Sequence, residues 1–235
     1  MSSFDLSQAQ RHIELLRGNK ANPVHFQCFV DDKSVDSKIA KEFYGEIDRY
    51  ANYLSHMQES GMGIYLTVNP TNGQGRKESD LTSIDWCFAD FDNTPLPQNL
   101  PLTPLFITQR DTHHSHLYWP ICGCEDAAEY RALQRRIALY LDADQQVIDP
   151  TRVLRLAGTK NLKDPNNPMM YYITQDNSSI LGDDFAYTPD EVVNAFVLPA
   201  DKEIELKNWI ENRKSIDDGT GYNDSKIYRD RLIKF

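Results

Sequence analysis

The sequence is poor in cysteine and has no long apolar run. Its 235 residues include four cysteines, and Cys28 and Cys87 stand in apolar patterns, where a free cysteine packs as a small hydrophobe. We therefore expect a reduced protein. No apolar run approaches the roughly 20 residues of a membrane-spanning helix, and residues 1–5 lack the features of a secretory signal. The sequence thus predicts a cytoplasmic location and no membrane partner.

Basic residues are also scarce, and the formal net charge is −10. This charge argues against non-specific nucleic-acid binding by the whole surface. The balance is uneven, however, because residues 131–163 carry seven bases against three acids, whereas residues 176–206 carry eight acids and one base. A local basic patch suits a groove that handles phosphates, although the favoured interpretation of Arg131, Arg135 and Arg136 is a solvated helix face.

Apolar periodicity predicts an α/β or α+β fold with a mixed sheet. Helical patterns cover residues 5–17, 37–59, 125–142, 188–197 and 201–213. Strand patterns cover residues 24–30, 64–68, 84–92, 105–108, 115–119, 153–156 and 170–174. We expect one main domain over residues 1–198 and a C-terminal helix and linker over 199–235, with residues 214–221 as linker. The end of the sequence interrupts a pattern, which predicts an accessory region beyond it.

Two carboxylates end the most apolar strand pattern. Asp90 and Asp92 are two residues apart, so on a strand they share one face. Burying two like charges together is costly without compensation. A pair of Mg²⁺ or Mn²⁺ ions would compensate, as in enzymes that align the two oxygens of a phosphoryl transfer. Alternatively, the two residues merely cap the strand.

A histidine cluster follows at His113, His114 and His116. Zinc binding with Cys122 and Cys124 is one interpretation, although their single intervening residue is shorter than the usual spacing. A metal-dependent nicking site of the His-hydrophobe-His type is another, although Ser115 stands where it requires an apolar residue. In a third, one histidine contacts a nucleotide triphosphate.

Residues 148–161 form a third cluster that begins with Asp149. Asp149 can supply a third carboxylate to a metal pair, and Asp144 is its rival. Arg152 and Arg155 carry guanidinium groups that suit phosphate oxygens. Further donors follow at Lys160, Asn161 and Lys163.

The ordered set of these motifs resembles the archaeo-eukaryotic primase superfamily, in particular the RepB-like primases and primase-polymerases of plasmids and phages. The resemblance is carried by residues 26–29, 61–69, 88–92, 116–119 and 149–159. It implies an RRM-like catalytic sheet with an N-terminal α/β module, so that residues 1–198 are expected to be a primase-polymerase catalytic domain. Two departures are Ala157, where the family usually has proline, and residues 110–114, where it has a Ser-Pro-Gly-like turn.

The resemblance also implies roles for individual residues. Asp90, Asp92 and Asp149 would bind Mg²⁺ or Mn²⁺ and be catalytic. His116 would contact the incoming nucleotide, with His114 as its rival. The remaining nucleotide-binding candidates are Arg152, Arg155, Arg76, Lys160 and Asn161.

The sequence therefore predicts a DNA-templated primase or primase-polymerase that serves the replication of a plasmid or phage. Its expected partners are a single-stranded DNA template, NTP or dNTP substrates and a replicative helicase. One alternative is a rolling-circle nicking endonuclease that uses His114, His116 and a tyrosine nucleophile. Another is a non-enzymatic initiator that only binds DNA.

Overall fold

The computed structural model describes residues 4–31, 40–164, 166–182 and 184–217. The chain divides into two compact units, Met1–Val197 and Leu198–Phe235. The first unit holds both large sheets, and the second is described through a single helix, α6 (Ala200–Asp217). Residues 218–221 of the expected linker lie outside the described residues, and Lys214–Asp217 continue the helix instead.

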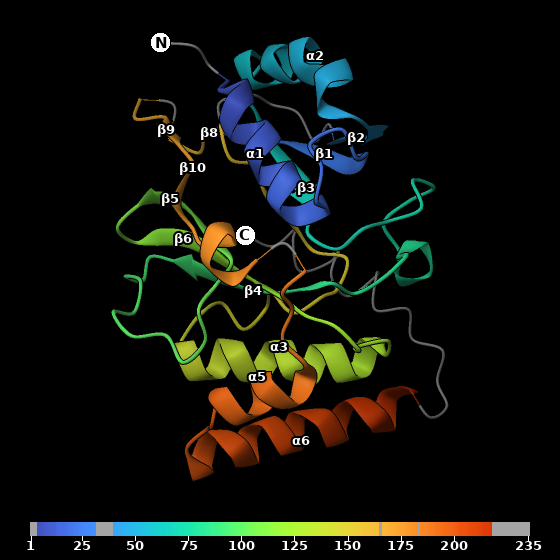
Figure 1. Ribbon diagram of the computed structural model, residues 1–235, viewed down its shortest axis with the longest axis vertical. Helices are drawn as coiled ribbons and strands as arrows, with labels where there is room; N and C mark the ends of the chain where they lie inside the picture. Colours follow the sequence, from blue (N-terminus) through green and yellow to red (C-terminus); the bar gives the residue numbers. More distant parts are fainter. Residues whose placement is uncertain (1–3, 32–39, 165, 183, 218–235) are drawn as a thin grey trace. The chain divides into compact units, whose positions relative to one another are not determined.

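The first sheet has four strands in the order β2-β1-β3-β7. Its strands are β1 (Val24–Val30), β2 (Ala40–Gly45), β3 (Met62–Thr67) and β7 (Val153–Arg155). Helix α1 (Leu6–Arg17) contacts α2 (Ile47–Glu59), which packs on β3. The first sheet and these two helices form the N-terminal module, in the upper part of Figure 1.

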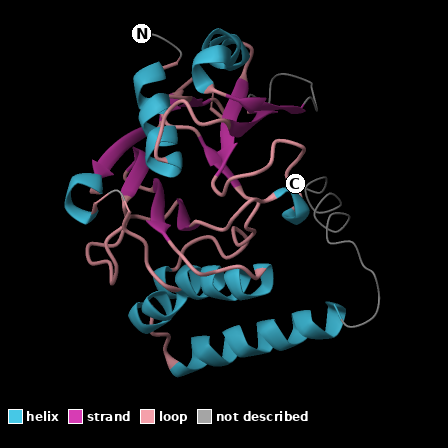
Figure 2. Cartoon of the chain, turned by 45° about the vertical axis from the view of Figure 1, so that its right-hand side comes forward, coloured by secondary structure: helices cyan, strands magenta, loops and turns pink. Residues whose placement is uncertain are grey.

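The second sheet has four strands in the order β10-β5-β6-β4. Its strands are β4 (Trp86–Asp92), β5 (Phe106–Asp111), β6 (His114–Pro120) and β10 (Tyr172–Asp176). Helix α3 (Ala127–Leu141) packs on β4 and on α5 (Pro189–Ala195). The sheet thus lies between the N-terminal module and α3, as Figure 2 also shows. The shorter elements are η1 (Glu78–Asp80), β8 (Lys160–Asn161), β9 (Met169–Met170) and α4 (Ser178–Leu181).

Local sequence explains where several helices begin. The Asp5 carboxylate accepts hydrogen bonds from the backbone of Ser7 and Gln8 at the start of α1, and Asp126 caps α3 in the same way. Such caps satisfy the free N–H groups of the first helical turn. Thr188 and its partner Glu191 form a capping box at α5.

The expected α+β class is confirmed, and two details differ. Residues 40–45, expected to be helical, form strand β2, while residues 37–39 lie outside the described residues. Long-range pairing overrides the helical stripe here, because β2 pairs with β1 and the Phe43 ring stacks on Phe26 at 5.2 Å. In addition, all pairings between the described strands are antiparallel, where the sequence predicted a mixed sheet.

For neighbours that are consecutive along the chain, antiparallel pairing follows from the connections. Parallel neighbours need a long crossover, whereas a tight turn joins antiparallel ones. Strands β5 and β6 form such a hairpin, and parallel pairing is confined to the isolated bridge between Ile121 and Tyr187. Among the described helices, none has the length and apolar character needed to cross a bilayer.

Candidate active site

The two expected catalytic carboxylates lie on the face of β4 that looks toward the N-terminal module. Cross-strand pairing sets Asp90 opposite His116 and Asp92 opposite His114. His116 Nε2 lies 3.5 Å from Asp90 Oδ1, and His114 Nε2 lies 3.0 Å from Asp92 Oδ1. The pattern of two carboxylates and two imidazoles follows from strand alternation alone.

Asp90 is held in an unfavourable electrostatic environment. Burial, Asp144 and Asp92 raise its pKa to about 7, against the opposing effect of Arg152 and Lys163. Burial disfavours the charged form of a carboxyl, and nearby like charges add to the penalty. The negative charge around Asp90 is therefore not compensated, and a bound cation would stabilise the ionised carboxylate.

The free edge of β4 is covered by polar groups, which fixes the position of Asp90. The Gln134 side chain of α3 accepts a hydrogen bond from the Phe88 N–H and donates one to the Phe88 carbonyl. Two residues further along, the Asp144 N–H donates to the Asp90 carbonyl at 2.9 Å. An edge strand exposes unpaired backbone groups, and these contacts satisfy them. They also bring Asp144 to Asp90.

His116 is a buried, neutral imidazole. Burial, with the nearby charges of Arg155 and His114, lowers its pKa to about 3. The ring stacks on Tyr171 with centroids 5.0 Å apart, and its Nδ1 lies 3.3 Å from the Thr108 hydroxyl. A ring fixed on both sides presents Nε2 toward Asp90 in one orientation.

His114 is set between two carboxylates. Its Nε2 faces Asp92, and its Nδ1 lies 2.7 Å from Asp111 Oδ1. Burial works against the charge of Asp111, but hydrogen bonds from His114, the His113 N–H and Arg110 outweigh it and lower the pKa of Asp111. Both rival histidines therefore stand at the site, each beside a different acidic residue.

The third expected carboxylate, Asp149, lies in a different setting. Its Oδ2 pairs with Arg152 Nη2 at 3.0 Å, and Arg152 also donates to the Gln146 carbonyl. Asp144 is the strongest of the charges that shift the pKa of Asp90, and Asp149 does not rank with the leading ones. The described contacts thus favour Asp144 as the acidic neighbour of Asp90, and Asp149 as a metal ligand stays a prediction.

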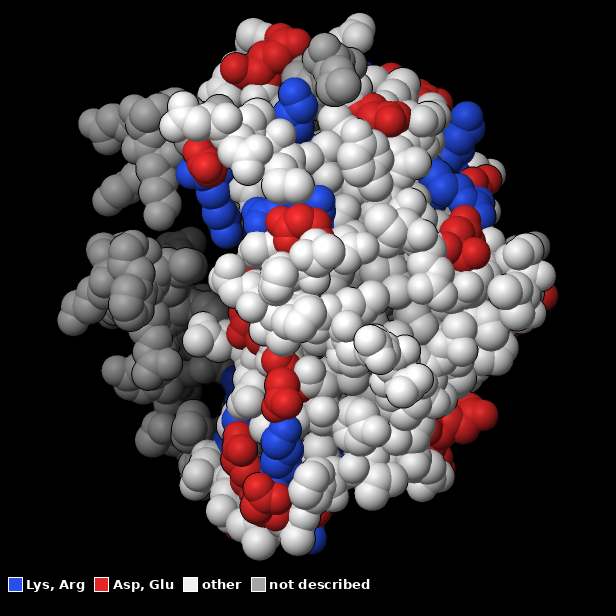
Figure 3. Space-filling model, turned by 90° about the vertical axis from the view of Figure 1, so that its left-hand side faces the viewer, with Lys and Arg blue, Asp and Glu red and all other residues white. Residues whose placement is uncertain are grey.

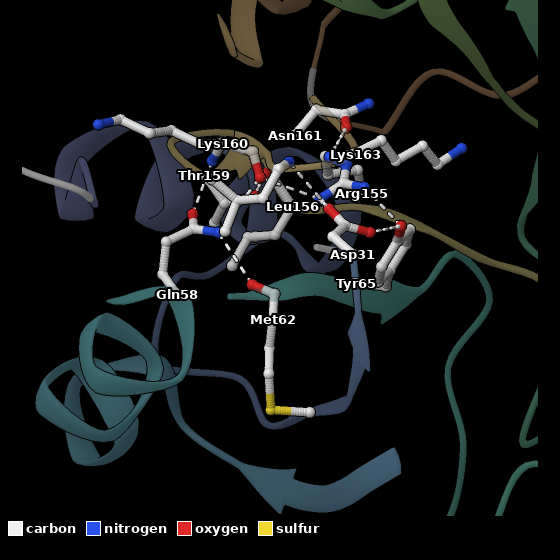
Figure 4. A network of polar contacts seen from close by, with 11 residues as sticks. Asp31, Gln58, Met62, Tyr65, Arg155, Leu156, Thr159, Lys160, Asn161 and Lys163 are labelled. Carbon is white, nitrogen blue, oxygen red and sulfur yellow. Dashed lines mark hydrogen bonds and ion pairs between the residues drawn. The ribbon is translucent and has the colours of Figure 1, made fainter. Parts of the chain in front are cut away.

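Arg155, expected to hold a triphosphate, is buried in an ion pair. Its Nη1 lies 2.7 Å from Asp31 Oδ2, and the two side chains are 4% and 3% exposed. Arg155 also donates to the Tyr65 hydroxyl and the Lys160 carbonyl (Figure 4). Gly63 makes room for this arrangement, since a Cβ there would come within 2.5 Å of the Asp31 carboxylate.

The other nucleotide-binding candidates fall in separate places. Figure 4 shows the side chains of Lys160 and Lys163 leaving the turn in opposite directions. Of these two lysines, Lys163 is the one that ranks with the leading charges that lower the pKa of Asp90. Asn161 is buried and accepts from the Lys163 N–H through Oδ1. Arg76 Nε lies 3.6 Å from Oε2 of Glu42. Glu42 belongs to β2, at the edge of the first sheet opposite β7, and no described contact brings Arg76 to Asp90.

The donor set at Asp90 suits a hard cation. Mg²⁺ and Mn²⁺ prefer carboxylate oxygens, and Asp90, Asp92 and Asp144 supply them. Among the described residues, no group of three or more histidine, cysteine, aspartate or glutamate side chains is placed to hold a metal ion, so the metal site stays a prediction. The zinc interpretation gains no support, because Cys122 and Cys124 follow the end of β6 while His114 stands at its start.

Sequence reasoning missed three contributors to this site. Tyr171, which stacks on His116, was visible only as one of two adjacent tyrosines. Nothing local in the sequence indicates that Asp31 pairs with Arg155. The third is His12, which acts at a turn where Gly158 lets the backbone approach closely, since a Cβ there would clash with the Asp5 carbonyl oxygen. His12 then accepts from the Ala157 N–H at 3.0 Å, which fixes the turn against α1.

The solved structures that this chain resembles include a primase-polymerase domain and a primase. The AEP domain of the primase-polymerase of cyanophage S-2L superposes with a TM-score of 0.62 at 19% identity, covering 83% of this chain and 99% of that one. Primase RepB′ gives 0.60 at 12% identity, covering 90% and 67%. The catalytic domain of RepB′ in complex with initiator DNA gives 0.54 at 15% identity, covering 86% and 96%. No protein-family model matches the chain, and no curated protein matches it significantly.

The chain therefore adopts the fold of the primase AEP domain. This confirms the resemblance to the archaeo-eukaryotic primases, and with it the fold class, at the level of the fold. Identities below 20% carry the architecture and not the activity, because one fold hosts many functions.

Proposed function

We propose that this protein is a DNA-templated nucleotidyltransferase, a primase or primase-polymerase that serves the replication of a plasmid or phage. The observation that carries the proposal is Asp90, a largely buried carboxyl at a strand end whose pKa is raised to about 7 by burial, Asp144 and Asp92. A perturbed carboxyl with a specific set of charged neighbours is typical of a functional site. The fold shared with three primase structures supports the same class.

In this proposal Asp90, Asp92 and Asp144 hold Mg²⁺ or Mn²⁺, with Asp149 as the alternative third ligand. The metal, when bound, activates the attacking hydroxyl and neutralises charge on the leaving pyrophosphate. The protein contributes alignment rather than covalent chemistry. Strand β4 sets two carboxylates on one face, and the hydrogen bond from the Asp144 N–H to the Asp90 carbonyl supports the choice of Asp144 by keeping its backbone next to Asp90.

The incoming nucleotide would lie over the same face. His116 offers a neutral imidazole held by Tyr171 and Thr108, so it can hydrogen-bond a substrate oxygen without adding charge. Arg152 and Lys163 are the cations that lower the pKa of Asp90 most strongly. Their positive charge suits the triphosphate of the nucleotide. Arg155 would not contact the nucleotide but would hold the turn at Lys160 in place, through its hydrogen bond to the Lys160 carbonyl.

Primer synthesis on single-stranded DNA tests the proposal. Purified protein is incubated with labelled ribo- or deoxynucleotides and Mg²⁺ or Mn²⁺, and the products are separated by length. We expect metal-dependent products that fall by about 10³-fold or more in Asp90→Ala and Asp92→Ala, because the lost ligands remove several kcal/mol of transition-state stabilisation. Asp85→Ala, which removes a carboxylate just before the opposite end of β4, is the matched control.

The alternative functions predict other observations on the same purified protein. A covalent 5′-phosphotyrosyl DNA adduct would indicate a nicking endonuclease that uses His114 and His116. Sequence-specific duplex binding without metal or nucleotide would indicate an initiator. An active and folded Asp90→Ala variant would contradict the proposed site. Productive mixtures of ribo- and deoxynucleotides would reveal the sugar preference, and a helicase that stimulates synthesis would identify that partner.

A further inference from the structure

A groove of about 590 Å³ opens beside the candidate site. It lies between the start of α1, the end of β5 and the turn that leads from β8 to β10. The residues that matter to its chemistry are Phe4, Arg110, Lys160, Met169, Met170 and Tyr172. Neither sequence reasoning nor the roles given above account for this combination of aromatic, thioether and cationic side chains.

Tyr172 gives the groove an open aromatic surface. Its side chain is 45% exposed, whereas the adjacent Tyr171 is buried against His116. Strand alternation explains the contrast, since neighbouring residues on an extended chain point to opposite sides. An exposed tyrosine flanked by half-buried Met169 and Met170 is a flat apolar platform at the groove wall.

The groove also carries positive charge. Arg110 and Lys160 line it. Arg110 Nε pairs with Asp111 Oδ2 at 2.8 Å, whereas the Lys160 ammonium makes no ion pair within the described residues. The one acid in the lining, Asp5, is engaged as the cap of α1. Figure 3 looks onto the side where β5, β6, β9 and β10 lie in Figure 1, and shows small groups of both charges separated by wide uncharged areas. A ligand here would meet individual cations rather than a broad basic field.

Arg110 connects the groove to the carboxylates. Its Nε donates to Asp111 Oδ2 at 2.8 Å, Asp111 Oδ1 accepts from His114 Nδ1 at 2.7 Å, and His114 Nε2 lies 3.0 Å from Asp92 Oδ1. Arg110 also lowers the pKa of Tyr171, against the larger effect of burial. A polymer bound at the carboxylates that continues past His114 would therefore reach the groove at Arg110.

We propose that this groove binds a single-stranded nucleic acid, with a base stacked on Tyr172 and phosphates held by Lys160 and Arg110. The inference rests on the proposed function and deepens it by assigning a path for a strand that reaches Asp90. Sequence-tolerant strand binding combines cations that follow the backbone with aromatic faces for the bases, and the groove offers both. Lys160 then serves the strand, while Lys163 serves the nucleotide.

Fluorescence anisotropy with labelled oligo(dT) and oligo(rU) tests the groove without catalysis. We expect Tyr172→Ala to weaken binding about 5- to 100-fold, as one lost stacking contact does. Tyr172→Phe keeps the ring and should bind within about twofold of the wild type. Lys160→Ala should reduce the slope of log affinity against log salt by about 0.7, the value for one phosphate contact to a single strand.

Matched controls come from the N-terminal module. Tyr53 is 40% exposed on α2, and Lys41 is exposed on β2. Tyr53→Ala and Lys41→Ala should leave both affinity and salt slope as in the wild type. Circular dichroism and thermal melting establish that each variant is folded, and Tyr172→Phe serves as the folded comparison if Tyr172→Ala is destabilised.

The outcomes separate this inference from the proposed function. Unchanged binding by folded Tyr172→Ala and Lys160→Ala, in a protein that makes primers, would overturn the groove and leave the function standing. Equal loss in Tyr53→Ala would overturn it too. Loss specific to Tyr172 and Lys160 would support it, with the two oligonucleotides showing whether DNA or RNA is preferred. If the protein binds strands through this groove but makes no product, the groove stands and the proposed function fails.

Discussion

The two sheets each carry a charged cluster: the cluster on the first sheet is buried and balanced, and the one on the second sheet is partly exposed and unbalanced. In the first sheet Arg155 meets Asp31 at 2.7 Å. Burial alone would lower the pKa of Arg155, but Tyr65 and Asp31 outweigh it and the pKa is raised. In the second sheet Asp90 meets further carboxylates, and its pKa rises to about 7. A buried charge that is fully paired contributes to specifying the fold, whereas one left unbalanced indicates a place for a ligand of opposite charge.

Removing the guanidinium from the balanced cluster is the strongest test of this contrast. Arg155→Met leaves the buried Asp31 carboxylate without its counter-charge, with the Tyr65 hydroxyl and the Leu162 N–H as its remaining described donors, so the free energy of unfolding should fall by about 3–5 kcal/mol. Thermal melting and urea titration measure the loss. Asp31→Leu combined with Arg155→Met removes both charges and should recover much of the stability. If Arg155→Met melts like the wild type and only raises the KM for nucleotide, Arg155 belongs to the triphosphate site after all.

Asp144 and Asp149 sharpen the other side of the comparison. Asp144→Ala should reduce primer synthesis by about 10²-fold, because it removes the charge that acts most strongly on Asp90. Asp149→Ala releases Arg152 and should cost severalfold less. The two variants are measured side by side at saturating metal, with melting temperature as the check on folding. The reverse order would restore Asp149 as the third carboxylate.

The sequence anticipated the strands that carry the site better than the partners that complete it. Alternation located β1 and β4, and it placed Asp90 and Asp92 on one face. These are local features, and local patterns record them. Asp31 meets Arg155 only because β1 and β7 both pair with β3, and no local pattern encodes that meeting. Asp144 could be named only as a rival to Asp149, because the loop after α3 turns back to β4 through the left-handed Asp142.

Strand β2 shows the same limit within the fold. Its apolar spacing matched a helix that continues into α2, and the actual end of the strand lies at Gly45. The φ angle of Gly45 is +157°, and a Cβ there would lie 2.6 Å from the Tyr50 ring. Tertiary contacts of this kind override periodicity over six residues.

Neutralising Asp90 should stabilise the metal-free protein. An acid whose pKa is higher in the folded state binds more protons there, so stability falls as pH rises from about 4 to 7. A shift of roughly three units corresponds to about 4 kcal/mol, reduced by relaxation to about 2–4. At pH 8 in chelator, Asp90→Asn should therefore melt above the wild type, while Asp85→Asn should not. Mn²⁺ should raise the melting temperature of the wild type more than that of Asp90→Asn, and a destabilised Asp90→Asn would contradict the imbalance.

Buried histidines make the smallest predicted effect, and its sign is opposite to that of Asp90. Burial lowers the pKa values of His12 and His116 to about 3 and lowers that of His25 as well. A histidine with a lowered pKa gains protons only on unfolding, so its stabilising effect is lost as pH falls below about 6.5. His12 and His116 each contribute about 1.4 kcal/mol per pH unit, and the opposite effect of Asp90 cancels one of these two contributions. With His25 acting in the same direction, the wild type in chelator should therefore lose at least about 1.4 kcal/mol per unit between pH 6 and 5, measured by urea titration. His12→Gln, which can still accept from the Ala157 N–H, should flatten that profile, and an equally steep profile in the variant would exclude His12 as a source of acid sensitivity.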